Sequence, residues 1–126
     1  AKAASLLETL RKTYKGKIIA VFEPNTGNRQ QEAIPQYDHA FKHADTVVIP
    51  RLTKLKIDPN DSESPLEGAE LAEVIRSTHK DVEYIEHDET LVKYLIQNTK
   101  KSDVIAFLGS HGFRGMIEET VQILKS

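Results

Sequence analysis

The chain has 126 residues, a length that fits one domain with its own buried core. Charged residues make up 29% and nearly balance to a net charge of −2, so charge gives no reason to expect nucleic acid as the main partner. The absence of cysteine excludes a disulfide framework and a thiolate metal site. No apolar run approaches the roughly 18 residues that span a bilayer, and we expect a cytoplasmic protein.

The first predicted elements are a helix, a strand and a second helix. Residues 2–14 predict an amphipathic helix because apolar residues recur there at helical spacing, namely at Ala3, Leu6, Leu7, Leu10 and Tyr14. "KIIAVFEP" then predicts a buried strand that ends at Pro24. The polar loop "NTGNRQQ" leads into a predicted helix of about ten residues, whose apolar face carries Ile34, Tyr37, Ala40 and Phe41.

The rest of the chain continues the alternation of strands and helices. "DTVVIPRL" predicts a strand, and "TKLKIDPNDSESPLEG" predicts a long loop because it is rich in Pro, Asp, Asn and Ser. The later predicted elements are helix 69–77, strand 81–87, helix 89–100, strand 103–109 and helix 116–125. Such alternation predicts parallel strands joined by right-handed crossovers, and hence an α/β fold with three α/β/α layers.

In a sheet of this kind, ligands bind at the carboxyl ends of the strands. The loops that follow strands are therefore the candidate sites, at residues 23–31, 50–58, 87–89 and 109–115.

Two of these loops carry glycine together with arginine. In "FLGSHGFRGM", residues 107–116, glycines would let backbone N–H groups approach an anion near the start of a helix, although tight turns also use glycine for positive φ. His111 and Arg114 can each serve a carboxylate or phosphate. Arg29 lies in the other loop, where a solvated side chain is the alternative. Together the loops favour a shared site that recognises an anion.

Other motifs indicate little chemistry. His39 and His43 have the i, i+4 spacing of a helical metal pair but lack a metalloprotease motif, and His79 and His87 are predicted to be surface residues. "DPNDSE" lacks the Gly and Glu of a calcium loop. There is no G-x-x-x-x-G-K-[ST] and no G-x-S-x-G, so we predict that the chain alone activates neither ATP nor a nucleophile.

"LGSHGFRG" resembles the late signature of the universal stress proteins, in which a Gly-Ser-His-Gly turn helps to hold ATP phosphates. That family's pattern has a second Gly-Ser or Gly-Thr further on, and "MIEETVQIL" contains neither. Its first strand also begins the chain and ends in Asp, whereas here a helix precedes a strand that ends in Glu23. The resemblance therefore covers one loop.

A second resemblance covers nearly the whole chain. "AKAASLLETLRKTY", "KIIAVFEP", "HADTVVIP", "LEGAELAEVI", "VEYIEHDETLVKYL" and "SDVIAFLGSHGFRGMIEETVQIL" follow one another as similar segments do in the C-terminal domain of Mur ligases. The branch in question contains the L-alanine-adding ligase and the murein tripeptide ligase. Gly112, Phe113 and Gly115 match the last loop of the tripeptide ligase, Ser-Asn-Gly-Gly-Phe-Gly-Gly-Ile. Pro24 and Arg29 are what remains of the alanine ligase motif Gln-Pro-His-Arg-Tyr-Ser-Arg-Thr, whose His-Arg is replaced by Asn25-Thr26.

The resemblance implies a Rossmann-like domain that closes over an ATP-bearing central domain and supplies the pocket for the incoming amino acid or peptide. Arg29 would then face the substrate carboxylate. The substrate-binding residues implied are Asn28, Arg29, Ser110, His111, Gly112 and Arg114. The resemblance places ATP, Mg and UDP-N-acetylmuramate in the full enzyme, with the N-terminal and central domains as partners. It implies no catalytic or metal residue here, and neither a nucleic-acid nor a membrane partner.

We therefore expect residues 1–126 to be one domain of a longer enzyme, since the chain begins at Ala1 without Met and within a predicted helix. The expected function is the joining of an amino acid or murein peptide to UDP-N-acetylmuramate, with the tripeptide-recycling ligase favoured and the domain alone inactive. The alternatives are the L-alanine-adding ligase, a stand-alone ATP-binding module of the stress-protein kind, and an interaction domain without a ligand.

Overall fold

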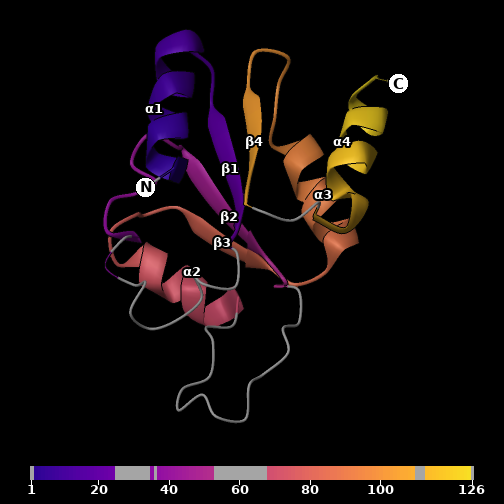
Figure 1. Cartoon of the computed structure of the whole chain (residues 1–126). Helices are drawn as coiled ribbons and strands as arrows, with labels where there is room; N and C mark the ends of the chain where they lie inside the picture. Colours follow the sequence, from indigo (N-terminus) through magenta and orange to yellow (C-terminus); the bar gives the residue numbers. More distant parts are fainter. Residues whose placement is uncertain (1, 25–34, 36, 53–67, 110–112, 126) are drawn as a thin grey trace.

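The computed structural model of the chain describes residues 2–24, 35, 37–52, 68–109 and 113–125 (Figure 1). Its helices and strands alternate along most of the chain, as the sequence predicts. In chain order they are α1 (Lys2–Thr13), β1 (Ile18–Glu23), β2 (Thr46–Pro50), α2 (Gly68–Arg76), β3 (Val82–Ile85), α3 (Asp88–Gln97), β4 (Val104–Gly109), the 3₁₀ turn η3 (Phe113–Gly115) and α4 (Met116–Lys125).

The strands form one four-stranded sheet in the order β3-β2-β1-β4, and every neighbouring pair is parallel. Residues alternate between the two faces of β1, so Ile18 and Ala20 belong to one apolar cluster and Ile19 and Val21 to the other. All six residues of β1 are buried, as expected for a strand that is covered on both sides.

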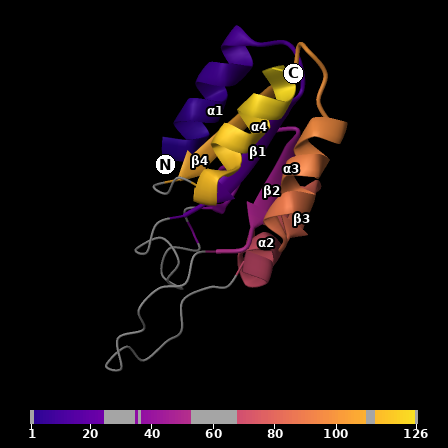
Figure 2. The ribbon, with the colours of Figure 1, turned by 90° about the vertical axis from the view of Figure 1, so that its right-hand side faces the viewer.

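The two apolar clusters define the three layers. One cluster joins the sheet to Leu7 of α1 and Leu71 of α2, and the other joins it to Leu91 of α3 and Met116 of α4. Figures 1 and 2 show α3 and α4 together on one face, with α1 and α2 on the other. The predicted α/β fold with three layers and a parallel sheet is therefore confirmed.

The predicted second helix is wrong where the structure describes it. Residues 38–43 form turns. Their backbone hydrogen bonds reach back three residues, as from Ala40 N–H to the Tyr37 carbonyl and from Ala44 N–H to that of Phe41. His39 has a φ of +57°, which interrupts any right-handed helix. Tyr37, Ala40 and Phe41 are nevertheless buried, so the predicted apolar positions were correct at these residues.

The first helix was predicted correctly, but its apolar face is narrower than predicted. Leu7 is fully buried and Leu10 partly buried, whereas Leu6 and Tyr14 are each 46% exposed. The helix contacts the sheet along one stripe, outside which Leu6 falls, and Tyr14 follows the last residue of the helix.

No helix in the described part of the chain is long and apolar enough to cross a membrane.

Candidate functional site at the carboxyl edge of the sheet

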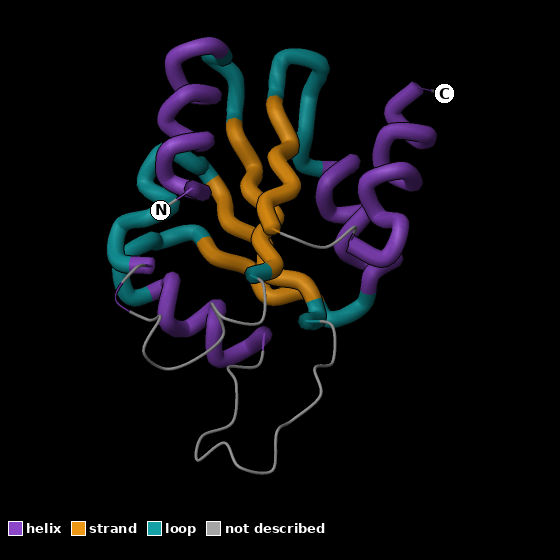
Figure 3. Tube along the Cα trace, viewed as in Figure 1, coloured by secondary structure: helices purple, strands orange, loops and turns teal. Residues whose placement is uncertain are grey.

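The order of the strands places a switch point between β1 and β4. From β1 the chain proceeds to β2 and β3 on one side, and it then returns to add β4 on the other side of β1. Tyr37 and Phe41, which follow β1, pack on one face of the sheet, whereas Met116, which follows β4, packs on the opposite face. The connections after β1 and β4 thus diverge, and ligands of open parallel sheets bind at such a point. Figure 3 shows the two strands side by side.

The two strands end on a close backbone contact. Glu23 is paired in register with Gly109, the last residue of β4. A Cβ atom on Gly109 would collide with the carbonyl oxygen of Glu23, and Gly109 has a φ of +148°. Glycine is therefore required here by both space and backbone conformation.

Glu23 carries a fully buried carboxyl group at this edge. Its exposed fraction is 0%, and it continues the row of Ile19 and Val21 toward α3 and α4. A buried carboxylate is costly unless it is paired or hydrogen-bonded. Glu23 is the only polar residue of β1, whose other residues are all apolar.

The last loop returns to the core at Phe113. The Phe113 side chain is 1% exposed, and its ring meets that of Phe107 edge to face with centroids 5.2 Å apart. Phe113 has a φ of +57° and Gly115 a φ of +83°. The role of glycine in a tight turn, which the sequence left open, is thus observed at Gly109 and Gly115. Contact with a ligand remains a prediction.

The predicted binding residues fall largely outside the described part of the chain. Asn28, Arg29, Ser110, His111 and Gly112 lie there, as does the side chain of Arg114, whose backbone belongs to η3. What the structure does place is the start of each loop: Pro24 follows β1 and Gly109 ends β4, on adjacent strands.

An ion pair joins two further predicted loops at this edge. Arg51 Nη2, just after β2, lies 3.6 Å from Asp88 Oδ2 at the start of α3. Sequence reasoning selected both loops as strand ends but did not single out either residue. Asp88 also suits its place because a carboxylate is favoured in the first turn of a helix.

The histidines do not form the helical pair that their spacing suggested. His39 lies in a turn, so the i, i+4 spacing to His43 does not place both on one helix face. Among the described residues, no group of three or more His, Asp or Glu side chains could hold a metal ion. His87 is exposed at the N-cap of α3, as predicted.

His79 was predicted to be a surface residue but is partly buried and bridges two segments. Its Nδ1 accepts the Asp81 N–H at 3.1 Å, and its Nε2 lies 2.8 Å from the Ala44 carbonyl oxygen. Because Nδ1 accepts, Nε2 must carry the proton that it donates to this carbonyl. The imidazole therefore acts as a structural link.

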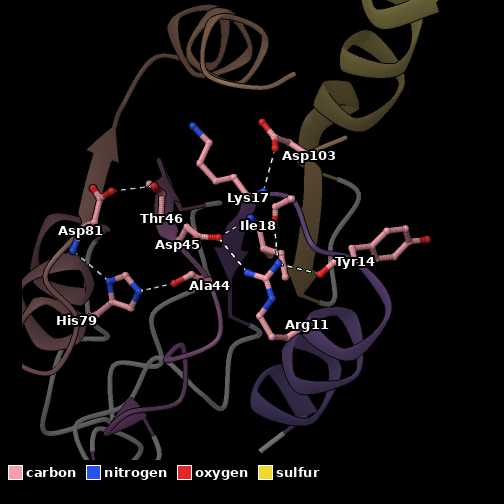
Figure 4. Close-up of polar contacts among 11 residues, drawn as sticks. Arg11, Tyr14, Lys17, Ile18, Ala44, Asp45, Thr46, His79, Asp81 and Asp103 are labelled. Carbon is pink, nitrogen blue, oxygen red and sulfur yellow. Dashed lines mark hydrogen bonds and ion pairs between the residues drawn. The ribbon is translucent and has the colours of Figure 1, made fainter. Parts of the chain in front are cut away.

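A polar network closes the opposite, amino edge of the sheet (Figure 4). Asp45 Oδ2 accepts the backbone N–H of Ile18 at 2.8 Å and also pairs with Arg11. Asp103 accepts the N–H groups of Lys100 and Lys17, and these backbone bonds lower the pKa of its carboxyl group. These contacts tie α1 and the starts of the strands together.

The same edge perturbs a tyrosine on α3. Burial raises the pKa of the Tyr94 hydroxyl, and the nearby carboxylates of Asp81 and Glu83 raise it further. Both effects disfavour the phenolate, so Tyr94 stays protonated at neutral pH.

A parallel sheet that is covered on both faces and has diverging connections at β1 and β4 defines a Rossmann-like, doubly wound domain. Ligands of this class of domain bind at the switch point. Residues 1–111 match the family model described as "Mur ligase, glutamate ligase domain". The chain therefore belongs to the Mur ligase family.

Curated relatives carry the name UDP-N-acetylmuramate–L-alanine ligase. That of Trichormus variabilis is 29% identical over 108 residues, which cover 86% of this chain and 21% of the relative. That of Brachyspira hyodysenteriae is 31% identical over 108 residues, covering 82% and 22%. The chain thus spans about a fifth of the length of these relatives.

Two solved structures share this fold. A domain from a putative UDP-N-acetylmuramate:L-alanyl-gamma-D-glutamyl-meso-diaminopimelate ligase of Haemophilus ducreyi has a TM-score of 0.64 at 21% identity, covering 98% of this chain and 81% of that one. A murein peptide ligase of Psychrobacter arcticus has a TM-score of 0.70 at 18% identity, covering 97% and 25%. At these identities the likeness concerns the fold alone.

Proposed function

We propose that this chain is the C-terminal domain of an ATP-dependent ligase that joins an amino acid or murein peptide to UDP-N-acetylmuramate. Its part is to bind the incoming amine substrate. Membership of the Mur ligase family supports the class of reaction, and the relatives' greater length supports a place within a longer enzyme.

The position of the switch point is the observation that carries this proposal. Arg29 follows β1 and His111 follows β4, and these strands are neighbours that end in register at Glu23 and Gly109. Two loops that leave adjacent strand ends toward opposite faces form the walls of a ligand cleft in this class of fold. We therefore propose that Arg29 and His111 contribute to one site at this edge of the sheet.

The charges at this edge suit a zwitterion. Arginine can bind a carboxylate through two parallel hydrogen bonds, which is the role proposed for Arg29. The carboxyl of Glu23 is fully buried at this edge, where a negative charge would be screened less than at the surface. It would favour the ammonium group of an amino acid or peptide nearby.

The chemistry of the full ligase needs groups that lie elsewhere. ATP with Mg would convert the carboxylate of the UDP-sugar into an acyl phosphate, which the amine then attacks. This chain has no G-x-x-x-x-G-K-[ST] loop, so we assign ATP and Mg to the other domains. The contribution of this domain is to hold the amine in place for attack, a major source of rate enhancement.

The proposed substrate is the murein tripeptide, with L-alanine as the alternative. Asn25 and Thr26 replace the His-Arg of the alanine ligase motif, which removes one expected anchor for a small amino acid. Product formation by the full-length ligase should be compared with L-alanine and with L-alanyl-γ-D-glutamyl-meso-diaminopimelate. A higher kcat/KM with the tripeptide is expected, whereas a preference for L-alanine would assign the enzyme to the alternative.

The stand-alone ATP module makes a different prediction for the same chain. Calorimetric titration of the 126 residues with ATP and Mg should give no saturable heat under our proposal. Binding with a Kd of about 1 μM would instead support the module of the stress-protein kind.

A further inference from the structure

A cleft lies at the amino edge of the sheet, where β2 and β3 begin. Its volume is about 660 Å³, within the range of small-ligand sites. One wall is the turn segment of residues 39–45 that leads into β2, and the other is the segment 76–80 between α2 and β3.

Hydrogen bonds between the segments on either side hold this cleft in shape. The His39 backbone N–H donates to Thr78 Oγ1 at 3.1 Å, and the ring of His79 bonds to the Ala44 carbonyl at 2.8 Å. Close by, the Thr46 hydroxyl donates to Asp81 Oδ2 at 2.8 Å. Figure 4 shows the last two of these links. The cleft is therefore preformed.

The acidic side chains around this cleft form hydrogen bonds or ion pairs with other residues of the domain. Asp45 accepts the N–H of Ile18 and pairs with Arg11, and Asp81 accepts the Thr46 hydroxyl. Asp38, beside the cleft, lies 2.8 Å from His39 Nδ1. Each of these three carboxylates thus has a hydrogen-bond or ion-pair partner within the scaffold.

The two lysines of the cleft, in contrast, have no such ion-pair partners among the described residues. Lys42 and Lys80 are exposed, one on each wall. Neither belongs to an ion pair among the residues that the structure describes. Arg76 differs, because it pairs with Glu73 and donates to the Val82 carbonyl at 2.9 Å.

A role in stabilising a helix does not account for these two lysines. Basic residues are favoured in the last turn of a helix, a place that Arg76 takes in α2. Lys80 follows beyond that turn, and Lys42 lies in turns between strands. His39 in addition holds a φ of +57°, a conformation that is costly for a residue other than glycine. That conformation accompanies the bond from its N–H to Thr78.

We propose that this cleft binds a small anion of the phosphate class, carrying two or more negative charges, between the ammonium groups of Lys42 and Lys80. Ammonium groups bind phosphate oxygens as point charges, and two of them on facing walls select a multiply charged ligand. The Thr78 hydroxyl accepts the His39 N–H and keeps its own hydrogen to donate to the anion. The site is independent of the proposed amine site because it lies at the other edge of the sheet.

Inorganic pyrophosphate is the probe for this proposal. Amide signals of the ¹⁵N-labelled 126-residue chain should be followed during titration at a constant ionic strength of about 0.15 M, where long-range charge effects are screened. Saturable shifts are expected for residues 38–45 and 77–80, with a Kd of about 1 mM or tighter. Chloride at equal ionic strength should not reproduce them.

Charge-removing variants complete the test. Lys42→Gln and Lys80→Gln should each weaken binding by about tenfold, and the double variant should abolish saturation. Lys93→Gln removes an exposed lysine from α3 and should leave the Kd unchanged. The spectrum of each variant, compared outside the cleft, shows whether the fold is retained. Absence of saturation, shifts spread evenly over the surface, or an unchanged Kd in the double variant would each overturn the proposal, whatever reaction the full-length enzyme performs.

Discussion

Glu23 and Gly109 end adjacent parallel strands in register, and the carbonyl oxygen of Glu23 fills the space that a side chain on residue 109 would need. This contact sets the ends of β1 and β4, after which the two candidate loops begin, side by side. The proposed function depends on it, because β1 and β4 flank the switch point of the sheet.

Replacement of Gly109 by alanine should destabilise the domain strongly. The added Cβ would collide with backbone that cannot move without disturbing the β1–β4 pairing, and φ would stay unfavourable. We expect a loss of about 3 kcal/mol or more in the free energy of unfolding.

Gly115→Ala is the matched control for this change. Gly115 also has a positive φ, but an added Cβ would have no neighbour within 4 Å. Its cost should be only about 1 to 2 kcal/mol, that of the backbone conformation. Urea denaturation of both variants measures the difference, and equal losses would show that the close approach at Gly109 is unimportant.

The fold was largely predictable because its strands are short apolar runs bounded by polar residues. "KIIAVFEP" and "DVIAFLG" gave β1 and β4 with errors of a residue or two, and α4 was predicted at its observed bounds. The helix predicted over residues 37–43 was wrong because the apolar spacing there suits both a helix and a series of turns that bury the same side chains. The positive φ of His39 could not be predicted from the amino-acid sequence around it.

The sequence assigns the candidate site to the ends of predicted strands, but it does not give the geometry of those strand ends. The order of the strands, which makes β1 and β4 neighbours, depends on contacts between residues far apart in sequence, such as Glu23 and Gly109. The pairing of Arg51 with Asp88 likewise required the position of α3 relative to β2. The burial of Glu23 could be suspected from the apolar residues before it in β1.

Asp103 should contribute to stability at neutral pH and lose that contribution in acid. Because backbone N–H groups of Lys100 and Lys17 lower the pKa of the folded carboxyl, the unfolded chain takes up this proton more readily. The contribution is therefore present above the unfolded pKa of about 3.9, and it disappears as the pH falls through the folded pKa.

Asp103→Asn should accordingly be less stable than the parent chain at neutral pH and show a smaller further loss on acidification. Chemical denaturation between neutral and acidic pH measures both quantities. Glu86→Gln, which alters an exposed carboxylate after β3, is the control and should follow the parent curve. Parallel curves for Asp103→Asn and the parent would refute the assignment.

His79 should be held in the tautomer that carries its proton on Nε2. Its Nδ1 accepts the Asp81 N–H and its Nε2 donates to the Ala44 carbonyl, so long-range ¹H–¹⁵N spectra at neutral pH should show a protonated Nε2. His79→Phe should cost about 1 to 3 kcal/mol, because a partly buried carbonyl loses its donor. The opposite tautomer, or an undiminished stability, would contradict the structural role.

Glu23→Gln should weaken the use of the amine substrate without unfolding the protein. The change preserves the size and an acceptor oxygen of a fully buried side chain but replaces its ionisable carboxyl group with a neutral amide. In the full-length ligase, the KM for the amine should rise by about threefold or more, with the KM values for ATP and UDP-N-acetylmuramate unchanged. A change confined to the KM for ATP would place Glu23 in a different role.

The most direct test of the central claim is the kinetic effect of Arg29→Ala and His111→Ala, made separately in the full-length ligase. The residues follow β1 and β4, so both should raise the KM for the amine substrate by about tenfold or more, while the KM values for ATP and UDP-N-acetylmuramate stay within about twofold of the parent. An unchanged KM for the amine in both variants, with folding intact, would contradict an amine site at the β1–β4 edge.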